Sequence, residues 1–120
     1  MPYRVLFVDD DPDTRDVIEM CLKVNGFEVR STISSSEALR IAREERFDAY
    51  LFDNWMPEMT GIELCLAVRQ FDASSPIIFY SGAAREVNRE EALSAGASYY
   101  LAKPVDLDQL VDTLSSLLER

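Results

Sequence analysis

The sequence predicts an α/β domain built around a parallel sheet, because two kinds of apolar pattern alternate along the chain. Short β-rich runs are separated by stretches in which apolar residues recur at helical spacing. The first, third and fourth runs are nearly continuous in apolar residues, as is typical of central strands covered on both faces. The second run is the least apolar, and we expect it at an edge. The five expected strands are residues 4–8, 28–31, 49–52, 77–80 and 99–102.

Helix boundary signals support the same alternation. Asp11 followed by Pro12 supplies an N-cap and a first-turn proline, and Gly26 supplies a stop for the first helix. Three further helices are expected to begin where capping-box spacing precedes an apolar helical pattern. These starts are Ser34 with Glu37, Thr60 with Glu63, and Asp106 with Gln109. The remaining helix, about residues 86–95, is rich in charge and is ended by Gly96.

Length and charge limit the class of protein. A chain of 120 residues with 48% apolar content can build one core, so we expect a single domain over residues 1–120. The formal charge of -10 would repel nucleic-acid phosphates, which argues against direct DNA or RNA binding. The apolar runs are too short to cross a bilayer, and the first residues do not resemble a secretory signal. We therefore expect a cytoplasmic protein without membrane attachment.

The residue types present also limit the chemistry. The chain has no histidine, which excludes Ser-His-Asp catalysis, His-ligated zinc and a phosphohistidine carrier. Cys21 and Cys65 lie among apolar residues at helical spacing, so buried thiols are expected in preference to a disulfide. Any chemistry must then depend on carboxylates, hydroxyls and lysine.

Polar residues follow four of the five expected strands. Ligands of open parallel sheets bind beyond the carboxyl ends of the strands, so these residues should share one edge. They are Asp9, Asp10 and Asp11 after the first strand, Asp53 after the third, Ser81 and Gly82 at the end of the fourth, and Lys103 and Pro104 after the fifth.

The acidic residues of this edge predict a magnesium site. Asp9, Asp10 and Asp53 would repel one another unless a hard cation and Lys103 offset their charge. Magnesium prefers oxygen ligands from one or two carboxylates, completed by water and phosphate oxygens. A carboxylate beside the metal can attack phosphorus, which makes Asp53 the candidate nucleophile. Asp11 is interpreted as a helix cap and is left out of the site.

The same residues carry a resemblance to a known family. The motifs are Val8-Asp9-Asp10, Asp53-x-x-Met56-Pro57-x-Met59-x-Gly61, Ser81-Gly82 and Lys103-Pro104. In this order they resemble the receiver domains of response regulators in two-component signalling systems, over essentially the whole chain. The resemblance implies a three-layer, doubly wound, flavodoxin-like fold with a five-stranded parallel sheet in the order 2-1-3-4-5.

The resemblance also implies a role for each site residue. Asp53 is similar to the phosphorylated aspartate of the family, Asp10 to its direct magnesium ligand, and Asp9 to the acid that binds the metal through water. The backbone carbonyl of Trp55 falls where the family has a further metal ligand. The remaining roles fall to Ser81 and Lys103, which match the groups that bind phosphoryl oxygens, and to Tyr100, which occupies the aromatic switch position.

The function implied is a phosphorylation-activated switch and not a turnover enzyme. A histidine kinase or phosphotransfer protein would donate the phosphoryl group. A downstream partner or output domain would bind the face of the fourth helix, fifth strand and fifth helix, and this face also allows a phosphorylation-dependent dimer. Two alternatives remain: an aspartate-nucleophile phosphohydrolase, which generally needs an acid where this chain has Trp55, and an interaction domain that is not phosphorylated. The Asn54-Trp55 pair departs from the commonest family pattern, and the direction of its effect on phosphate lifetime stays open.

Overall fold

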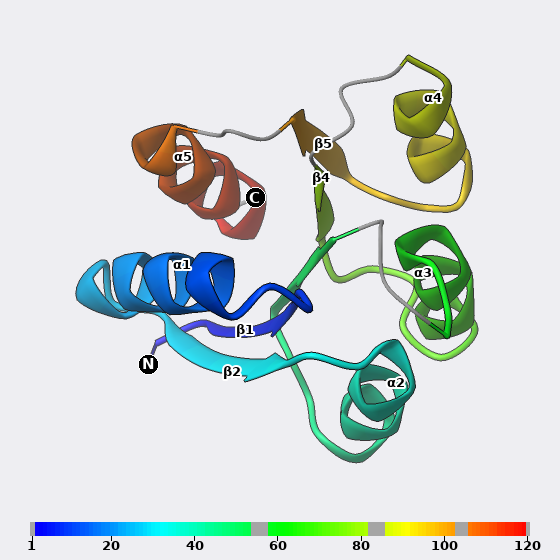
Figure 1. Ribbon diagram of the computed structural model, residues 1–120, viewed down its shortest axis with the longest axis horizontal. Helices are drawn as coiled ribbons and strands as arrows, with labels where there is room; N and C mark the ends of the chain where they lie inside the picture. The colour runs from blue at the N-terminus through cyan, green and yellow to red at the C-terminus, as the bar shows by residue number, and fades with distance from the viewer. Residues whose placement is uncertain (1, 54–57, 82–85, 103–105, 120) are drawn as a thin grey trace.

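The computed structural model describes residues 2–53, 58–81, 86–102 and 106–119, in which five strands alternate with five helices (Figure 1). The predicted strands are confirmed, and the second and fourth each extend one residue further than expected. In chain order the elements are β1 (Arg4–Val8), α1 (Pro12–Val24), β2 (Glu28–Thr32), α2 (Ser35–Glu44), β3 (Ala49–Phe52), α3 (Gly61–Arg69), β4 (Ile77–Ser81), α4 (Glu86–Ser94), β5 (Tyr99–Ala102) and α5 (Leu107–Leu118).

All five strands are parallel and form one sheet in the order β2-β1-β3-β4-β5. The expected flavodoxin-like order is confirmed, and β2 is an edge strand as predicted. The chain passes from β1 outward to β2 and then back to β3 on the other side of β1. The carboxyl ends of β1 and β3 therefore flank the point at which the winding direction reverses, where ligands of such sheets bind.

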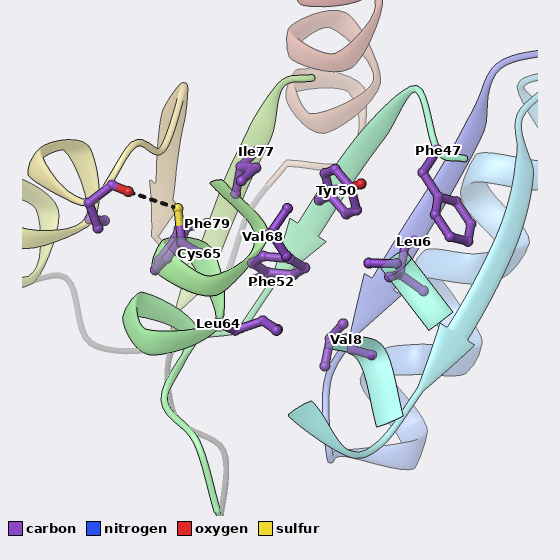
Figure 2. Close-up of a cluster of buried hydrophobic side chains, with 14 of the residues drawn as sticks. Leu6, Val8, Phe47, Tyr50, Phe52, Leu64, Cys65, Val68, Ile77 and Phe79 are labelled. Atoms are coloured by element: carbon purple, nitrogen blue, oxygen red, sulfur yellow. Dashed lines mark hydrogen bonds between the residues drawn. The ribbon is translucent and has the colours of Figure 1, made fainter. Parts of the chain in front are cut away.

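Helices cover both faces of the sheet and give the fold three layers (Figure 1). Alternate strand residues point to opposite faces, so each strand contributes to two cores. Val5, Phe7 and Leu51 pack with α1 and α5 on one face. Leu6, Val8, Tyr50, Phe52 and Phe79 pack with α2, α3 and α4 on the other (Figure 2).

The helices begin largely as the sequence predicts. Asp11 accepts a hydrogen bond from the backbone N–H of Thr14, and Thr60 and Glu63 form the complete reciprocal capping box. Asp106 also caps its helix, but it accepts from the backbone N–H of Asp108 and not through the expected spacing to Gln109. An aspartate side chain is short enough to bond to the second helical residue, which explains the difference.

The two cysteines differ in their surroundings. Both are free thiols, as expected. Cys65 is buried between α3 and α4, where its Sγ donates to the carbonyl of Ala95 at 3.4 Å (Figure 2), and burial raises its pKa to about 11. Cys21 is only partly buried, so the expectation of two buried thiols is wrong for this residue. Its position on α1 beside Leu107 leaves one side of the thiol uncovered.

Within the described part of the chain, none of the helices combines the length and the apolar character that crossing a membrane requires.

Candidate functional site

The pairing of β1 with β3 brings Asp9 and Asp53 to the same edge of the sheet. Val8 and Phe52 are register partners at the ends of these strands, and each is followed directly by an aspartate. The backbone N–H of Asp53 donates to the carbonyl of Val8 at 2.9 Å, which continues the strand pairing one residue beyond β3. On the other side of β1, the N–H of Asp9 donates to the carbonyl of Thr32 at 3.2 Å. Both aspartates are thus held by backbone hydrogen bonds of the sheet.

Three carboxylates meet at this edge. Asp9, Asp10 and Asp53 each offer one oxygen, and these three oxygens lie within 4.8 Å of one another. Asp9 is completely buried and Asp53 is 4% exposed, whereas Asp10 is exposed to solvent. The predicted grouping of these residues is therefore seen in the structure, with Asp10 on its open side.

The donor set fits a magnesium ion. Mg²⁺ is a hard cation that prefers carboxylate oxygens and keeps several waters, so a group of three carboxylates with one exposed member offers both ligands and access. Two buried carboxylates so close together would repel strongly in a site of low dielectric, and a divalent cation offsets that repulsion. The carboxylate of Asp9 is further oriented by the backbone N–H of Asp11, which donates to its Oδ1 at 2.9 Å.

Asp11 belongs to helix α1 and not to this carboxylate group. Its Oδ2 accepts from the backbone N–H of Thr14 at 3.3 Å and also from the Thr14 hydroxyl. Pro12 follows as the first helical residue. The prediction that Asp11 is a helix cap is confirmed.

The other predicted site residues are described to different extents. Ser81 is the last residue of β4 and is the register partner of Ala102, so the backbone places it at the same edge. Trp55 and Lys103 lie outside the described residues.

Tyr100 is 7% exposed, and its ring stacks on that of Phe79 with 6.4 Å between centroids. Its side of β5 therefore faces the core, in the cluster that also contains Phe52 and Phe79.

Sequence reasoning missed a contact between the start of α2 and the residues that precede α3. Glu58 accepts hydrogen bonds from the hydroxyls of Ser34 and Ser36, and the backbone N–H of Met59 donates to the hydroxyl of Ser35. These contacts join residues 22 to 24 positions apart, which no helical or strand periodicity links. The run Ser34-Ser35-Ser36 was the sequence signal that could have predicted this contact. One serine is sufficient to cap a helix, so the other two hydroxyls are left for different contacts.

Comparison with known proteins agrees with the fold and the acidic group. The family model described as "Response regulator receiver domain" matches residues 5–115. The chain is 40% identical over 117 residues to the transcriptional regulatory protein PrrA of Mycobacterium tuberculosis, covering 98% of this chain and 50% of that protein. It is 35% identical over 120 residues to the response regulator MprA of Mycolicibacterium vanbaalenii, covering 100% of this chain and 52% of that protein. The chain thus spans about half the length of these curated relatives.

Solved structures match over nearly the whole chain. A CheY-like response regulator receiver domain protein from Methanospirillum hungatei superposes with a TM-score of 0.95 at 31% identity, covering 99% of this chain and 95% of the other. The receiver domain of a sensor histidine kinase from Pseudomonas aeruginosa superposes with a TM-score of 0.92 at 30% identity and complete coverage of both chains. The latter structure has a magnesium ion coordinated in its active site cleft. With this fold, this acidic group and the family match over most of its length, the chain belongs to the response regulator receiver domain family.

Proposed function

We propose that the chain is a phosphorylation-activated switch that accepts a phosphoryl group on Asp53 from a histidine kinase or phosphotransfer protein. The observation that carries the proposal is the meeting of the Asp9, Asp10 and Asp53 carboxylates within 4.8 Å at the carboxyl edge of the sheet. Asp53 is the member at the end of the central strand β3, and its position is fixed by the backbone bond to Val8. A fixed carboxylate is a better nucleophile toward an incoming phosphoryl group because less orientational freedom is lost on reaction.

In the proposed reaction, a carboxylate oxygen of Asp53 forms a bond to the phosphorus of a phosphohistidine. The bond from phosphorus to the imidazole nitrogen breaks, its electron pair stays on the imidazole, and an acyl phosphate forms on Asp53. Ser81 and Lys103 would bind the phosphoryl oxygens through a hydroxyl and an ammonium group. Receiver domains are generally not classed as enzymes, and here the chain itself is the acceptor.

The carboxylate group supports a magnesium cofactor. Asp10 and Asp53 would hold Mg²⁺ directly, Asp9 would hold it through a water molecule, and the backbone carbonyl of Trp55 would add a neutral ligand. When bound, Mg²⁺ supplies positive charge that offsets the repulsion between the carboxylates and the phosphoryl oxygens. The exposed position of Asp10 supports this assignment, because the metal must be reached from solvent.

Phosphorylation would then change the face formed by α4, β5 and α5. The phosphoryl group would draw the Ser81 hydroxyl toward it. This movement would change the space next to Tyr100, whose ring stacks on Phe79 in the core. We propose that a downstream partner or output domain senses this face, and that a phosphorylation-dependent dimer forms through it. The curated relatives PrrA, a transcriptional regulatory protein, and MprA, a response regulator, are both about twice the length of this chain. A cytoplasmic location is part of the proposal, since the kinase domains that would donate the phosphoryl group act there.

Incubation with acetyl phosphate and Mg²⁺, followed by intact-mass measurement, tests the proposal. We expect the mass of one phosphoryl group to be added in the presence of Mg²⁺ and removed by hydroxylamine, which cleaves acyl phosphates. A protein that stays unmodified under these conditions would support the interaction-domain alternative. Continuous release of phosphate from small phosphorylated substrates would support the phosphohydrolase alternative.

A further inference from the structure

The connection between β1 and α1 consists of three aspartates, of which Asp9 and Asp10 belong to the acidic group and Asp11 does not. Because the connection is so short, the two carboxylates of the group are attached closely to both the strand and the helix. A change in the first turn of α1 therefore reaches the acidic group through a very short stretch of backbone.

The direction of the Asp9 carboxylate depends on hydrogen bonds, because the terminal torsion of an aspartate side chain has broad energy minima. One such bond comes from the backbone N–H of Asp11, which donates to Oδ1 of Asp9 at 2.9 Å. Asp9 is completely buried, so bulk solvent does not compete for this bond. A hydrogen bond to a charged acceptor is about twice as strong as one between neutral groups, so the Asp11 amide limits the rotation of this carboxylate.

The Asp11 amide is itself held by the start of α1. Pro12 disfavours helical angles for the residue before it, and Asp11 has an extended backbone with φ of -85° and ψ of 113°. The Asp11 carbonyl accepts from the N–H of Arg15 at 3.0 Å. Its Oδ2 accepts from the N–H of Thr14 at 3.3 Å and also from the Thr14 hydroxyl. These contacts fix the backbone of Asp11 and, with it, the direction of its N–H.

We propose that the cap formed by Asp11 and Thr14 positions the Asp9 carboxylate for Mg²⁺, through the backbone N–H of Asp11. The inference rests on the proposed function, in which Asp9 holds the metal through a water molecule. A carboxylate that is already oriented loses less rotational freedom on binding. Without the cap, the first turn of α1 loosens, the hold on Oδ1 of Asp9 weakens, and Mg²⁺ affinity falls. Asp11 and Thr14 are thus positioning residues and not ligands.

Two substitutions at Asp11 separate the cap from the charge. Asp11→Ala removes both the capping oxygen and the negative charge. Asp11→Asn removes the charge alone, because asparagine is among the preferred N-cap residues. Thr14→Val removes the hydroxyl donor with little change in shape, and Thr14→Ser restores it. The matched control is Asp106→Ala, which removes the capping carboxylate of α5, a residue outside the acidic group.

Mg²⁺ titrations followed by the amide NMR shifts of Asp9 and Asp53 measure the affinity, and urea unfolding verifies that each variant is folded. We expect Asp11→Ala to weaken Mg²⁺ binding by about tenfold, the lower end of the loss seen when groups that orient metal ligands are removed. Asp11→Asn and Asp106→Ala should stay within about threefold of wild type, because single exposed charges are screened by salt. Thr14→Val should weaken binding and Thr14→Ser should restore it.

A second measurement requires no metal. The amide of residue 11 should be less protected from hydrogen exchange in Asp11→Ala than in Asp11→Asn, once the intrinsic exchange rates of the two residues are taken into account. The reason is that the cap holds this N–H against Oδ1 of Asp9. Loss of protection at residue 11 together with loss of Mg²⁺ affinity is the result expected of a positioning role.

Equal Mg²⁺ affinities of Asp11→Ala and Asp11→Asn would overturn the positioning role, because the cap would then contribute nothing to binding. An equal loss of affinity in Asp106→Ala would also overturn it, because the effect would then be one of general stability. In both cases, Mg²⁺ binding by the wild-type protein would leave the metal site of the proposed function intact. A wild-type protein that binds no Mg²⁺ would overturn the proposed function, and the positioning role with it.

Discussion

The backbone N–H of Asp53 donates to the carbonyl of Val8 at 2.9 Å, so the nucleophile proposed here stands one residue beyond a strand pairing. Asp9 follows Val8 directly and is fixed by the neighbouring strand β2 through Thr32. The backbones of the two buried aspartates are therefore held in place by the sheet. Substitutions that keep the shape of these side chains should test their chemistry without disturbing their positions.

Replacing Asp10 by Asn should lower Mg²⁺ affinity and raise stability in the absence of metal. The substitution removes one anionic ligand, and we expect a loss of at least about tenfold in affinity, since even outer positions around a metal cost that much. It also removes one of three mutually repelling charges, which should stabilise the metal-free protein by at most about 1 kcal/mol because Asp10 is exposed.

Mg²⁺ titration and urea unfolding with and without metal measure these opposite effects. Asp16→Asn provides a control on α1, where a carboxylate of equal charge lies outside the acidic group. Unchanged Mg²⁺ affinity in Asp10→Asn would place the metal elsewhere.

Gly96 should tolerate alanine less well than Gly26, although both have positive φ values of 111° and 90°. A Cβ at Gly26 would meet no atom within 4 Å, whereas one at Gly96 would lie 2.9 Å from Cγ of Arg69. Nε and Nη2 of Arg69 donate to the Gly96 carbonyl at 3.0 and 2.8 Å, so displacing this side chain breaks the link between α3 and the end of α4.

We expect Gly26→Ala to cost about 1 kcal/mol in the free energy of unfolding from backbone strain alone. Gly96→Ala should cost about 2–3 kcal/mol, because lost hydrogen bonds add to the strain. Urea unfolding of the two variants compares them directly. Equal losses would mean that Arg69 adjusts without cost and does not hold this turn.

The sequence predicts the strands well because a parallel sheet buried on both faces requires nearly continuous apolar runs. The 4–8 and 49–52 strands, both inside the sheet, have the predicted bounds for this reason. The apolar pattern specifies the ends of the strands less well. Thr32 and Ser81 are polar, and they belong to β2 and β4 because they pair with residues of the neighbouring strands. The acidic group was predictable because parallel strands place their carboxyl ends at one edge.

Other features required the three-dimensional structure. The contact of Glu58 with Ser34 and Ser36 joins side chains whose spacing follows no periodic pattern. The partial exposure of Cys21 depends on how closely α5 approaches α1, which helical periodicity does not specify. The burial of Tyr100 follows from its stacking on Phe79 of the neighbouring strand, so it too depends on the tertiary arrangement.

Phosphorylation should alter the environment of Tyr100 together with that of Ser81. In this structure the Tyr100 ring is buried against Phe79. We expect formation of the acyl phosphate to change the fraction of molecules in which the ring has this buried position. A coupling of about 1–3 kcal/mol between the site and the α4, β5 and α5 face is typical of such switches. Tyr100→Ala should remove the coupling while leaving phosphorylation of Asp53 intact.

Amide and side-chain NMR shifts, recorded with and without beryllofluoride as a phosphoryl mimic, report this coupling. In wild type the shifts should extend from the carboxylate edge to α4, β5 and α5, whereas in Tyr100→Ala they should stop near Asp53. Tyr100→Phe keeps the ring and serves as the milder comparison, because truncating a buried aromatic side chain to alanine costs about 3–5 kcal/mol of stability. If beryllofluoride changes the wild-type NMR shifts only near the carboxylate edge of the sheet, coupling through Tyr100 is ruled out.

Site-resolved mass spectrometry after treatment with acetyl phosphate and Mg²⁺ tests whether Asp53 is the residue that accepts the phosphoryl group. We compare wild type with Asp53→Asn, and with Asp11→Asn as a control in which the substituted side chain still caps α1. We expect one phosphoryl group on Asp53 in wild type and in Asp11→Asn, and none in Asp53→Asn. Phosphorylation of Asp53→Asn at the wild-type rate, or at a single other residue in wild type, would contradict it.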